Sequence, residues 1–498
     1  MKRFSRLLVS SVAASILASP ISAQPGGGLV GGVVGGVGGA VGNTLGGIRG
    51  TVGGALNSVG GTVGSTVGGV RGALGGVGGL VGGLTGGSAT GARSVLGGGG
   101  SGSGAINQLY TQRGSFGEMA ALDQVVGGAQ EGLSPTESEN YREARLAALI
   151  DANSKVLDRD TDGQPVRKRE LIAMNPDPVS LALAARAGFR VIGDELEGGI
   201  GLRLVTLGIP ARSNVRQAMK TIRRAAPALQ VAFNHVYEPS GGALLPVAGA
   251  KIAASLPRAR NITRIAMIDG GVASHPSLAR ASIVQQGFAG PAQATGHGTA
   301  VGSLLVGEQG PFRGAARGAQ LFVGDIYGGN PAAGSVTSIV RALNWAVSKN
   351  PSVINISLVG PNNTALAHAI AAAQARGIQI VAAVGNDGPA APPQYPASYA
   401  GVVSVTGVDS HGRALREAGR AKHLDFAAPG ADMIAAFPGN GYTQVRGTSF
   451  AAPLAAARLA LAGSYQRLTL EARPGEGQVG RGIVCALCRV DPRYLARK

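Results

Sequence analysis

The stretch RGTSFAAP, Arg446–Pro453, places a serine on a Gly-Thr turn at the start of an alanine-rich run. A serine at such a point ordinarily caps a helix, because its hydroxyl accepts a backbone N–H that has no partner within the helix. The free N–H groups of a helix start also favour a developing negative charge. Ser449 is therefore either a structural cap or a nucleophile, and this stretch alone is compatible with both interpretations.

Two further polar residues lie where a strand or a helix is expected to end or begin. Asp269 closes the apolar segment RIAMID, and His297 stands between two glycines at an expected helix start. Alone, an Asp-Gly pair is typical of a turn. Together the residues follow the order Asp, His, Ser, and amide hydrolysis by a serine needs a base and an anion that orients the base. The sequence predicts Ser449 as nucleophile, His297 as base and then acid, and Asp269 as the orienting carboxylate.

Strand and helix patterns alternate along this part of the chain. Apolar segments predict strands at 264–269, 319–326, 352–358, 378–384 and 402–408, and helices at 297–307, 335–348, 363–377 and 449–462. This alternation favours an α/β fold, a parallel sheet with helices on both faces. Ligands of such folds bind at the carboxyl ends of the strands, which is where Asp269 lies.

Six motifs occur in order: MIDGGVASHPSL, GHGTAVGSLLVG, INISLVGP, VAAVGNDG, FAAPG and GTSFAAP. In this order and spacing they resemble those of the subtilisin-like serine peptidases, over residues 255–465. The resemblance implies a subtilisin-like fold, a peptide or protein substrate bound as an added strand, and Asn386 as a donor to the oxyanion. It also implies that two strands line the substrate's side-chain pocket, namely Ser357, Leu358, Val359 and Gly360, and Ala383, Val384 and Gly385.

The sequence departs from the family pattern in two places. Val359 stands where many relatives carry glycine, and Gln394 lies where the pocket floor is expected, so no preference for large P1 residues follows. Between Gly307 and Pro311 there is no room for the loop that holds calcium in several relatives. We therefore expect no metal and no other cofactor.

Residues 166–240 have a strand and helix order of their own. The order β-α-β-β-α-β predicts a small α+β, ferredoxin-like sandwich. Its place before the peptidase domain resembles the family's propeptide, which assists folding and blocks the cleft until it is cut away. The chain's own propeptide is thus an expected partner, with a cut between Glu238 and Arg260 around the connector 241–254. His235 is a lone strand histidine, for which we expect a structural role.

The first residues are typical of an export signal. Residues 1–23 join three cations to a short apolar run that ends in Ile-Ser-Ala, which predicts a secreted or cell-envelope protein. An uncleaved anchor is the alternative. Residues 24–104 form a Gly-rich low-complexity segment with an 11-residue Val/Leu repeat. We interpret this segment as a linker, or as a stripe that becomes ordered on a membrane, at the cell surface or against another copy.

Two other regions carry weaker signals. In the helical and linker region 105–165, a helix begins after Ser134, and Asp158, Asp160 and Asp162 resemble the opening of a calcium loop. The twelfth position of that loop is Arg169 rather than glutamate, so a polar turn is the alternative. In the basic tail 466–498, Cys485 and Cys488 predict a local disulfide or free thiols, because a zinc site needs two more ligands.

Charge and composition exclude one class of partner. Lysine and arginine outnumber aspartate and glutamate 45 to 27, for a net charge of +18, but these cations are scattered and no aromatic residues interleave with them. We therefore expect no nucleic-acid binding. Two functions are left: a secreted serine endopeptidase made as a self-processing precursor, or an inactive subtilisin-fold surface or binding protein. The intact set of Asp269, His297, Asn386 and Ser449 favours the first.

Overall fold

The computed structural model describes residues 135–240, 242–247 and 263–490. The predicted export signal, the glycine-rich repeat, the Ser134 helix cap and most of the connector lie outside the described residues. Within the described ranges, no helix is both long enough and apolar enough to cross a bilayer.

A seven-stranded parallel sheet forms the centre of the peptidase domain, in the order β17-β16-β15-β13-β8-β12-β9. In chain order its strands are β8 (Arg264–Asp269), β9 (Ser282–Gly287), β12 (Gln320–Asp325), β13 (Val353–Ile356), β15 (Gln379–Ala383), β16 (Val403–Val408) and β17 (Phe426–Pro429). Its long helices are α8 (Gly296–Val306), α9 (Val336–Ser348), α10 (Thr364–Gln374) and α11 (Thr448–Ala462). The predicted parallel sheet with helices is confirmed.

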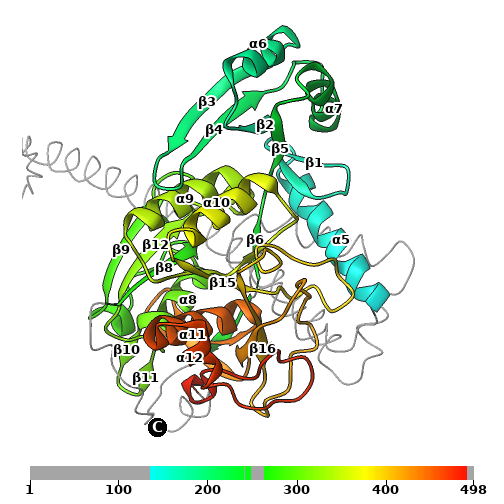
Figure 1. The fold of residues 1–498 in the computed structure, drawn as a ribbon. Coiled ribbons are helices and arrows are strands. Elements are labelled where there is room, and N and C mark those ends of the chain that lie inside the picture. The colour runs from blue at the N-terminus through cyan, green and yellow to red at the C-terminus, as the bar shows by residue number, and fades with distance from the viewer. Residues whose placement is uncertain (1–134, 241, 248–262, 491–498) are drawn as a thin grey trace, which may run out of the picture. The chain divides into compact units, whose positions relative to one another are not determined.

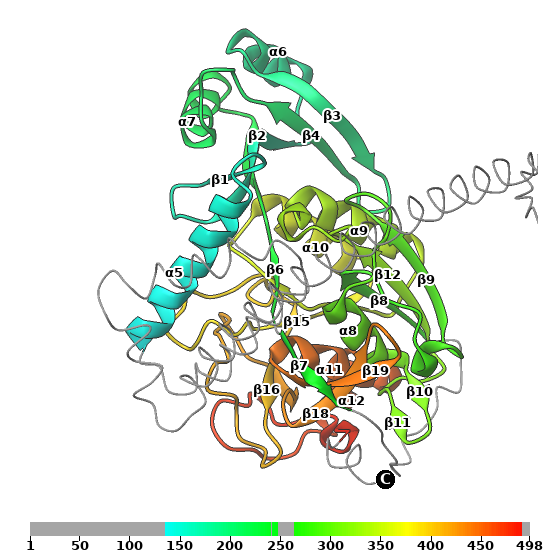
Figure 2. The ribbon, with the colours of Figure 1, turned by 180° about the vertical axis from the view of Figure 1, so that it is seen from behind.

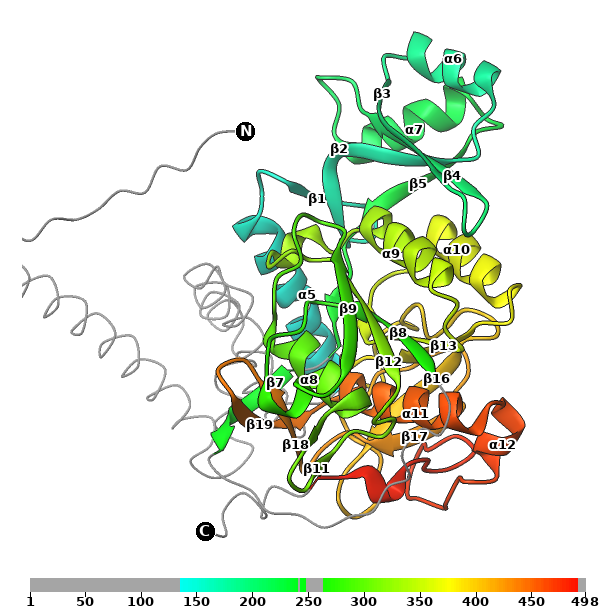
Figure 3. The same cartoon turned by 90° about the vertical axis from the view of Figure 1, so that its left-hand side faces the viewer.

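Helices cover both faces of this sheet. Successive residues of a strand point to opposite faces, so the apolar side chains on each face need their own helical layer to be buried. Along β8, Ile265 and Met267 join the core cluster built with α8 and α11, whereas Ala266 and Ile268 join the cluster built with α9 and α10. Figures 1 and 3 show the two pairs of helices on opposite sides of the strands. Each strand end thus lies between two packed helical layers, which fixes the side chains at that edge.

Several strands of the peptidase domain were not predicted. β9 and β17 lie at the two edges of the main sheet, and β18 (Met433–Phe437) and β19 (Gly441–Arg446) form an antiparallel hairpin that β7 (Gly242–Val247) extends. Two short pairs complete the strands: β10 (Glu308–Gln309) with β11 (Phe312–Arg313), and β6 (Glu238–Pro239) with β14 (Leu358–Val359). Single turns of 3-10 helix occur at Pro276–Leu278, Pro331–Ala333 and Ala486–Cys488.

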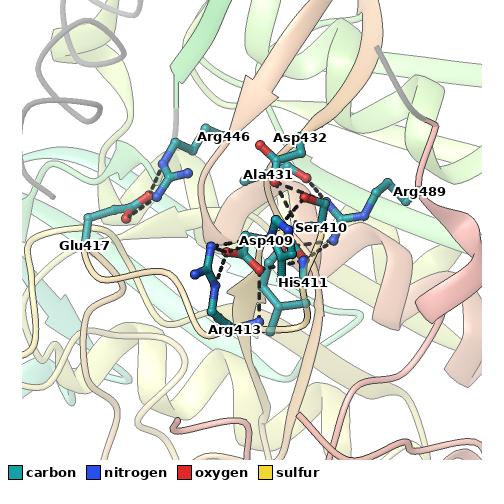
Figure 4. A network of polar contacts seen from close by, with 10 residues as sticks. Asp409, Ser410, His411, Arg413, Glu417, Ala431, Asp432, Arg446 and Arg489 are labelled. Atoms are coloured by element: carbon teal, nitrogen blue, oxygen red, sulfur yellow. Dashed lines mark hydrogen bonds and ion pairs between the residues drawn. The ribbon is translucent and has the colours of Figure 1, made fainter. Parts of the chain in front are cut away.

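The predicted basic tail does not leave the peptidase domain between residues 466 and 490. After α12 (Tyr465–Thr469), the chain returns Val484 and the disulfide-bonded Cys485 and Cys488 to the core cluster of α8 and α11. Arg489 donates hydrogen bonds to the carbonyl oxygens of Ala431 and Asp409, and Figure 4 shows this network. Apolar residues late in the segment explain the difference, since they are buried by packing against the sheet.

The small domain, residues 157–235, has the predicted ferredoxin-like order. Its elements are β1 (Leu157–Arg159), β2 (Pro165–Met174), α6 (Pro178–Arg186), β3 (Arg190–Glu197), β4 (Leu202–Gly208), α7 (Val215–Ala225) and β5 (Gln230–His235). The strands pair antiparallel, with β2 between β4 and β5 and with β3 beyond β4. The start of α7 is set by Asn214 and Gln217, which form a reciprocal capping box.

The sheet of the small domain is covered by two different partners. On one face Leu171, Val205 and Leu207 pack with α6 and α7. On the other face Ile172 and Leu204 belong to the same core cluster as α9 and α10 of the peptidase domain. Helix α5 (Pro135–Ala152) precedes the sheet, and its Leu149 and Ile150 pack with residues of both domains.

Candidate active site

Asp269 is the last residue of β8 and is fully buried. Its Oδ1 lies 2.8 Å from His297 Nδ1 and accepts the backbone N–H of Gly270 at 2.6 Å. Because an ionised carboxylate can only accept hydrogen bonds, this contact places the imidazole proton on Nδ1. The other ring nitrogen is then free to accept a proton.

His297 lies in the first turn of α8, whose start is fixed by Thr295. The Thr295 side chain accepts the N–H of Gly298 at 2.9 Å and so caps the helix. A Cβ at position 298 would stand 2.2 Å from the carbonyl oxygen of Gly270, so glycine is required for this close approach. His297 Nε2 faces the Oγ of Ser449 at 2.9 Å.

Ser449 is not the cap of its helix. The helix α11 begins at Thr448, the cap position is Gly447 with φ +138°, and no side chain caps it. The Ser449 hydroxyl is instead directed to His297, with the whole side chain buried. The sequence alternative in which Ser449 serves only as a cap therefore does not describe this geometry.

Asn386 lies beside this helix start, and its amide orientation is fixed. Its Oδ1 accepts the backbone N–H of Thr448 at 3.0 Å, which leaves Nδ2 to donate. Nδ2 lies 2.5 Å from the carbonyl oxygen of Ser240. The backbone N–H of Ser449 donates to the same oxygen at 3.1 Å.

The chain's own segment before residue 241 thus occupies the site. Ser240 donates its backbone N–H to the carbonyl of Ser357 at 3.1 Å, and β6 pairs antiparallel with β14. On the far side of residue 241, β7 continues along β19, and Figure 2 shows β6 and β7 following each other. The backbone is held on both sides of the Ser240 carbonyl.

A second contact of the occupied segment, with residues 334–335, was not predicted from the sequence. Tyr237 donates its backbone N–H to the carbonyl of Gly334 at 2.8 Å, and Val236 forms a bridge with Ser335. The occupied segment therefore lies between 334–335 and 357–359. No polar motif marks Gly334, so its contact with Tyr237 could not be predicted from the sequence.

The Tyr237 side chain is buried next to Gly360. Its ring is fully buried, and a Cβ at Gly360 would stand 2.7 Å from it, so glycine at 360 makes room for the ring. Its hydroxyl donates to the carbonyl of Pro361 at 2.5 Å. Burial raises the pKa of Tyr237 well above the ordinary value, so the hydroxyl is a permanent donor.

The residues predicted as the other wall of the side-chain pocket, Ala383–Gly385, lead to the start of α11. Gly385 exchanges hydrogen bonds of 3.1 Å with Thr448, which ties Gly385 to the turn that precedes Ser449. A Cβ at Gly385 would stand 3.3 Å from both Val359 and Gln394. Val359 and Gln394 thus converge on Gly385, the region where the sequence predicted the pocket.

An ion pair lies on the segment that leads to Ser449. Arg446, three residues before Ser449, binds Glu417 through two contacts of 2.7 and 3.0 Å (Figure 4). The Glu417 side chain is 3% exposed, and of the two contacts the one from Arg446 Nη2 to Glu417 Oε2 is a hydrogen bond. This ion pair ties the end of β19 to the loop that contains Glu417. The backbone carbonyl of Glu417 in turn accepts the N–H of Gly388 at 2.9 Å.

The aspartates resembling a calcium loop have other partners. Asp160 accepts the backbone N–H groups of Asp162 and Gln164, both at 2.8 Å, and faces Nε2 of His235 at 2.9 Å. This is the polar turn that the sequence left open as an alternative, and His235 has a structural role there. Within the described ranges, no cluster of three or more His, Cys, Asp or Glu residues could hold a metal ion.

A buried Ser-His-Asp set at the carboxyl ends of a parallel sheet, facing an extended peptide segment, defines a serine peptidase. The sequence profile of the Subtilase family matches residues 261–472. Subtilisin Savinase from Lederbergia lenta is 34% identical over 204 residues, which is 40% of this chain and 75% of Savinase. The chain belongs to the subtilase family and is a subtilisin-like serine endopeptidase that acts on peptide substrates.

Other relatives agree over the same region. The Major intracellular serine protease of Bacillus subtilis (strain 168) is 32% identical over 239 residues, covering 45% of this chain and 74% of that protein. The Alkaline protease of Shouchella clausii is 34% identical over 204 residues, 40% of this chain and 53% of its own length. The crystal structure of fervidolysin from Fervidobacterium pennivorans matches with a TM-score of 0.55 at 19% identity, over 69% of this chain and 63% of that one, which shows a shared fold.

Proposed function

We propose that the protein is an exported serine endopeptidase made as a precursor that cuts itself between Ser240 and Gly241, with Asp269, His297, Asn386 and Ser449 as its catalytic residues. The observation that carries this proposal is the Ser240 carbonyl oxygen, which accepts hydrogen bonds from Asn386 Nδ2 and the Ser449 N–H. Two hydrogen-bond donors share this carbonyl oxygen, and a serine hydroxyl that is hydrogen-bonded to a histidine lies beside it. This arrangement fits attack of the serine hydroxyl on the carbonyl carbon. The cut falls within the range 238–260 expected from the sequence.

Each step then has an assigned group. Ser449 Oγ bonds to the Ser240 carbonyl carbon while its proton passes to His297 Nε2, and Asp269 stabilises the resulting imidazolium. The carbonyl oxygen takes up the negative charge between Asn386 Nδ2 and the Ser449 N–H. When the oxyanion collapses, the bond to the Gly241 nitrogen breaks and His297 returns the proton to that nitrogen. Water, activated by His297, releases the acyl group from Ser449.

The nucleophile is tested by replacing Ser449 with alanine in the full chain. Because α11 has no side-chain cap to lose, folding should survive, whereas self-processing should slow by several orders of magnitude. Mass spectrometry of protein from a host without related proteases should find wild-type fragments ending at Ser240 and an intact variant. Ser464→Ala is the matched control, because Ser464 caps α12 by accepting the Arg467 N–H at 3.2 Å. Equal trimming of wild type and Ser449→Ala at this bond would overturn self-processing.

A fluorophosphonate probe separates this proposal from the inactive binding protein. A serine that is activated by a neighbouring histidine reacts with the probe. In the processed protein, the covalent adduct should therefore map to Ser449. Failure to label a folded, propeptide-free sample would favour the binding function.

Export is supported by the character of residues 1–23. Cell fractionation should place the processed enzyme outside the cytoplasm, with no fragment that retains these residues. Full-length protein confined to the cytoplasm would contradict export without touching the peptidase activity.

A further inference from the structure

Helix α5 places an arginine between the occupied segment and the peptidase domain. Arg145 is 7% exposed, and its Nη1 lies 2.9 Å from the Glu238 carboxylate. Its Nη2 lies 2.9 Å from the carboxylate of Asp387. One guanidinium therefore joins an acidic residue of the segment to an acidic residue of the enzyme.

The position of Glu238 relative to the attacked carbonyl defines its place in the substrate. If Ser240 is P1, the residue whose carbonyl is attacked, Glu238 is P3. Asp387 directly follows Asn386, whose side chain holds the Ser240 carbonyl. Asp387 is thus anchored next to the reacting bond, beside the third substrate position.

Without Arg145 this arrangement is unfavourable for an acidic P3 residue. The Glu238 and Asp387 side chains are only 14% and 11% exposed, and they bind two nitrogens of one guanidinium, so the carboxylates are close neighbours. Like charges in a poorly solvated position repel more strongly than they do in water. A basic P3 side chain, in contrast, could place its cation where the guanidinium now lies.

The negative charge of Asp387 also acts on a second cation of α5, Arg142. Although burial opposes its charge, the hydrogen bond to Glu139 and the negative charge of Asp387 raise the pKa of Arg142. The environment of Asp387 in the precursor is thus one that favours positive charge.

We propose that Asp387 makes the processed enzyme select basic P3 residues, and that Arg145 supplies the positive charge that lets the precursor present Glu238 there instead. This inference rests on the proposed function, since it takes Ser240 as P1. Arg145 belongs to the amino-terminal fragment and leaves with it. Without Arg145, the processed enzyme disfavours substrates with an acidic P3 residue, although its own chain carries Glu238 at that position.

The selectivity is tested on processed enzyme with three chromogenic peptides, Tyr-X-Pro-Ser-p-nitroanilide, in which X is Lys, Gln or Glu. We expect kcat/KM for the Lys peptide to exceed that for the Glu peptide about tenfold at low salt, with a smaller ratio in added NaCl. Asp387→Asn should reduce this ratio to about twofold or less. Glu476→Gln, which removes an exposed carboxylate elsewhere, should leave the ratio unchanged.

The outcomes separate this inference from the proposed function. Cleavage of all three peptides with equal kcat/KM, or an equal Lys preference in wild type and Asp387→Asn, would overturn the inference and leave the peptidase intact. No cleavage of any peptide together with no fluorophosphonate labelling would instead overturn the function.

The role of Arg145 is tested in the full chain. Arg145→Gln should slow the appearance of the fragment ending at Ser240 about tenfold, and adding Glu238→Lys should restore it, because lysine can pair with Asp387 directly. Arg159→Gln is the control, since it breaks the ion pair with Asp151 at the surface. Equally slow processing of Arg145→Gln with and without Glu238→Lys would overturn the charge role of Arg145.

Discussion

The two sheets of this protein are built from similar local patterns but are buried in different ways. The parallel sheet of the peptidase domain has its own helices on both faces. The antiparallel sheet of the small domain has its own helices on one face and packs its other face into the cluster of α9 and α10. The helices of the small domain therefore cover only one face of its sheet, and we expect part of its stability to depend on the peptidase domain.

Adjacent residues of β2 provide the strongest way to break this comparison. Leu171 packs on α6 and α7 and Ile172 on the peptidase side, and both are fully buried. In the uncut Ser449→Ala chain, either residue changed to alanine should lower the free energy of unfolding by about 3 kcal/mol. In the fragment 135–240, only Leu171→Ala should cost this much, because the face of Ile172 is then exposed to water. Urea unfolding of both proteins measures the difference.

Val191→Ala is the control for this experiment, since Val191 is already 52% exposed. It should change the stability of either protein by less than about 0.5 kcal/mol. Equal costs of Leu171→Ala and Ile172→Ala in the fragment would show that the small domain does not depend on its partner.

A polar contact between the two domains gives the second test. Asn363 uses Oδ1 to accept the N–H of Ala365 and donates from Nδ2 to His235 Nδ1, so His235 Nε2 donates to Asp160. Both carboxylate oxygens of Asp160 accept hydrogen bonds. An asparagine at this position would turn its NH2 group toward one of these N–H donors, so two donors would face each other. Asp160→Asn should therefore lower the stability of the uncut chain by about 2 kcal/mol, measured by urea unfolding. Asp162→Asn, an exposed change in the same turn, should cost little.

The effect of Asp160→Asn should depend on pH in a defined direction. Burial opposes ionisation of Asp160, but the hydrogen bond from His235 and those from the Gln164 and Asp162 backbone outweigh it and lower its pKa. A group with a lowered pKa in the folded state stabilises the fold above its unfolded pKa, near 4, and loses this contribution as pH falls through the folded value. The gap between wild type and variant should be full at pH 7 and narrow below about pH 4. A gap that widens on acidification would contradict this role.

The smallest effect is expected at Tyr237, which belongs to the occupied segment but is buried by the peptidase domain. Tyr237→Phe retains the ring and leaves the carbonyl of Pro361 without its donor. The uncut chain should lose about 1 kcal/mol of stability in urea unfolding. Tyr442→Phe removes a bond to exposed Gln309 and should change little. If Tyr237→Phe and Tyr442→Phe lowered the free energy of unfolding equally, the buried hydrogen bond of Tyr237 would contribute no more than an exposed one.

Much of the fold could be predicted because its signals are local. β8 spans the residues predicted for it, and the strand and helix order of the small domain follows from apolar periodicity and turn residues. β9 was missed because its residues are mostly exposed and carry no apolar run. The β18–β19 hairpin was not predicted because four of the five residues of β18 are buried, so this strand lacks the polar and apolar alternation typical of an antiparallel hairpin.

The site divides in the same manner. Asp269, His297 and Ser449 stand in motifs whose glycines and spacing mark strand and helix ends, so their meeting could be predicted. The pairing of Glu238–Pro239 with Leu358–Val359 joins segments over one hundred residues apart, and no local pattern encodes it. Arg145 is one of many scattered arginines in the sequence, and only its contacts distinguish it.

The pairing of β6 with β14 and of β7 with β19, before and after residue 241, has a further consequence for the timing of the proposed activity. If the proposed cut is made between residues 240 and 241, the segment that occupies the site is tethered before the cut, and short tethers give effective concentrations in the millimolar range. Cutting the bond turns this intramolecular contact into an ordinary complex of two chains, whose dissociation depends on the total protein concentration. Cutting and activation are then separate events: a concentrated sample can be fully cut and still inactive, and simple dilution should release its activity.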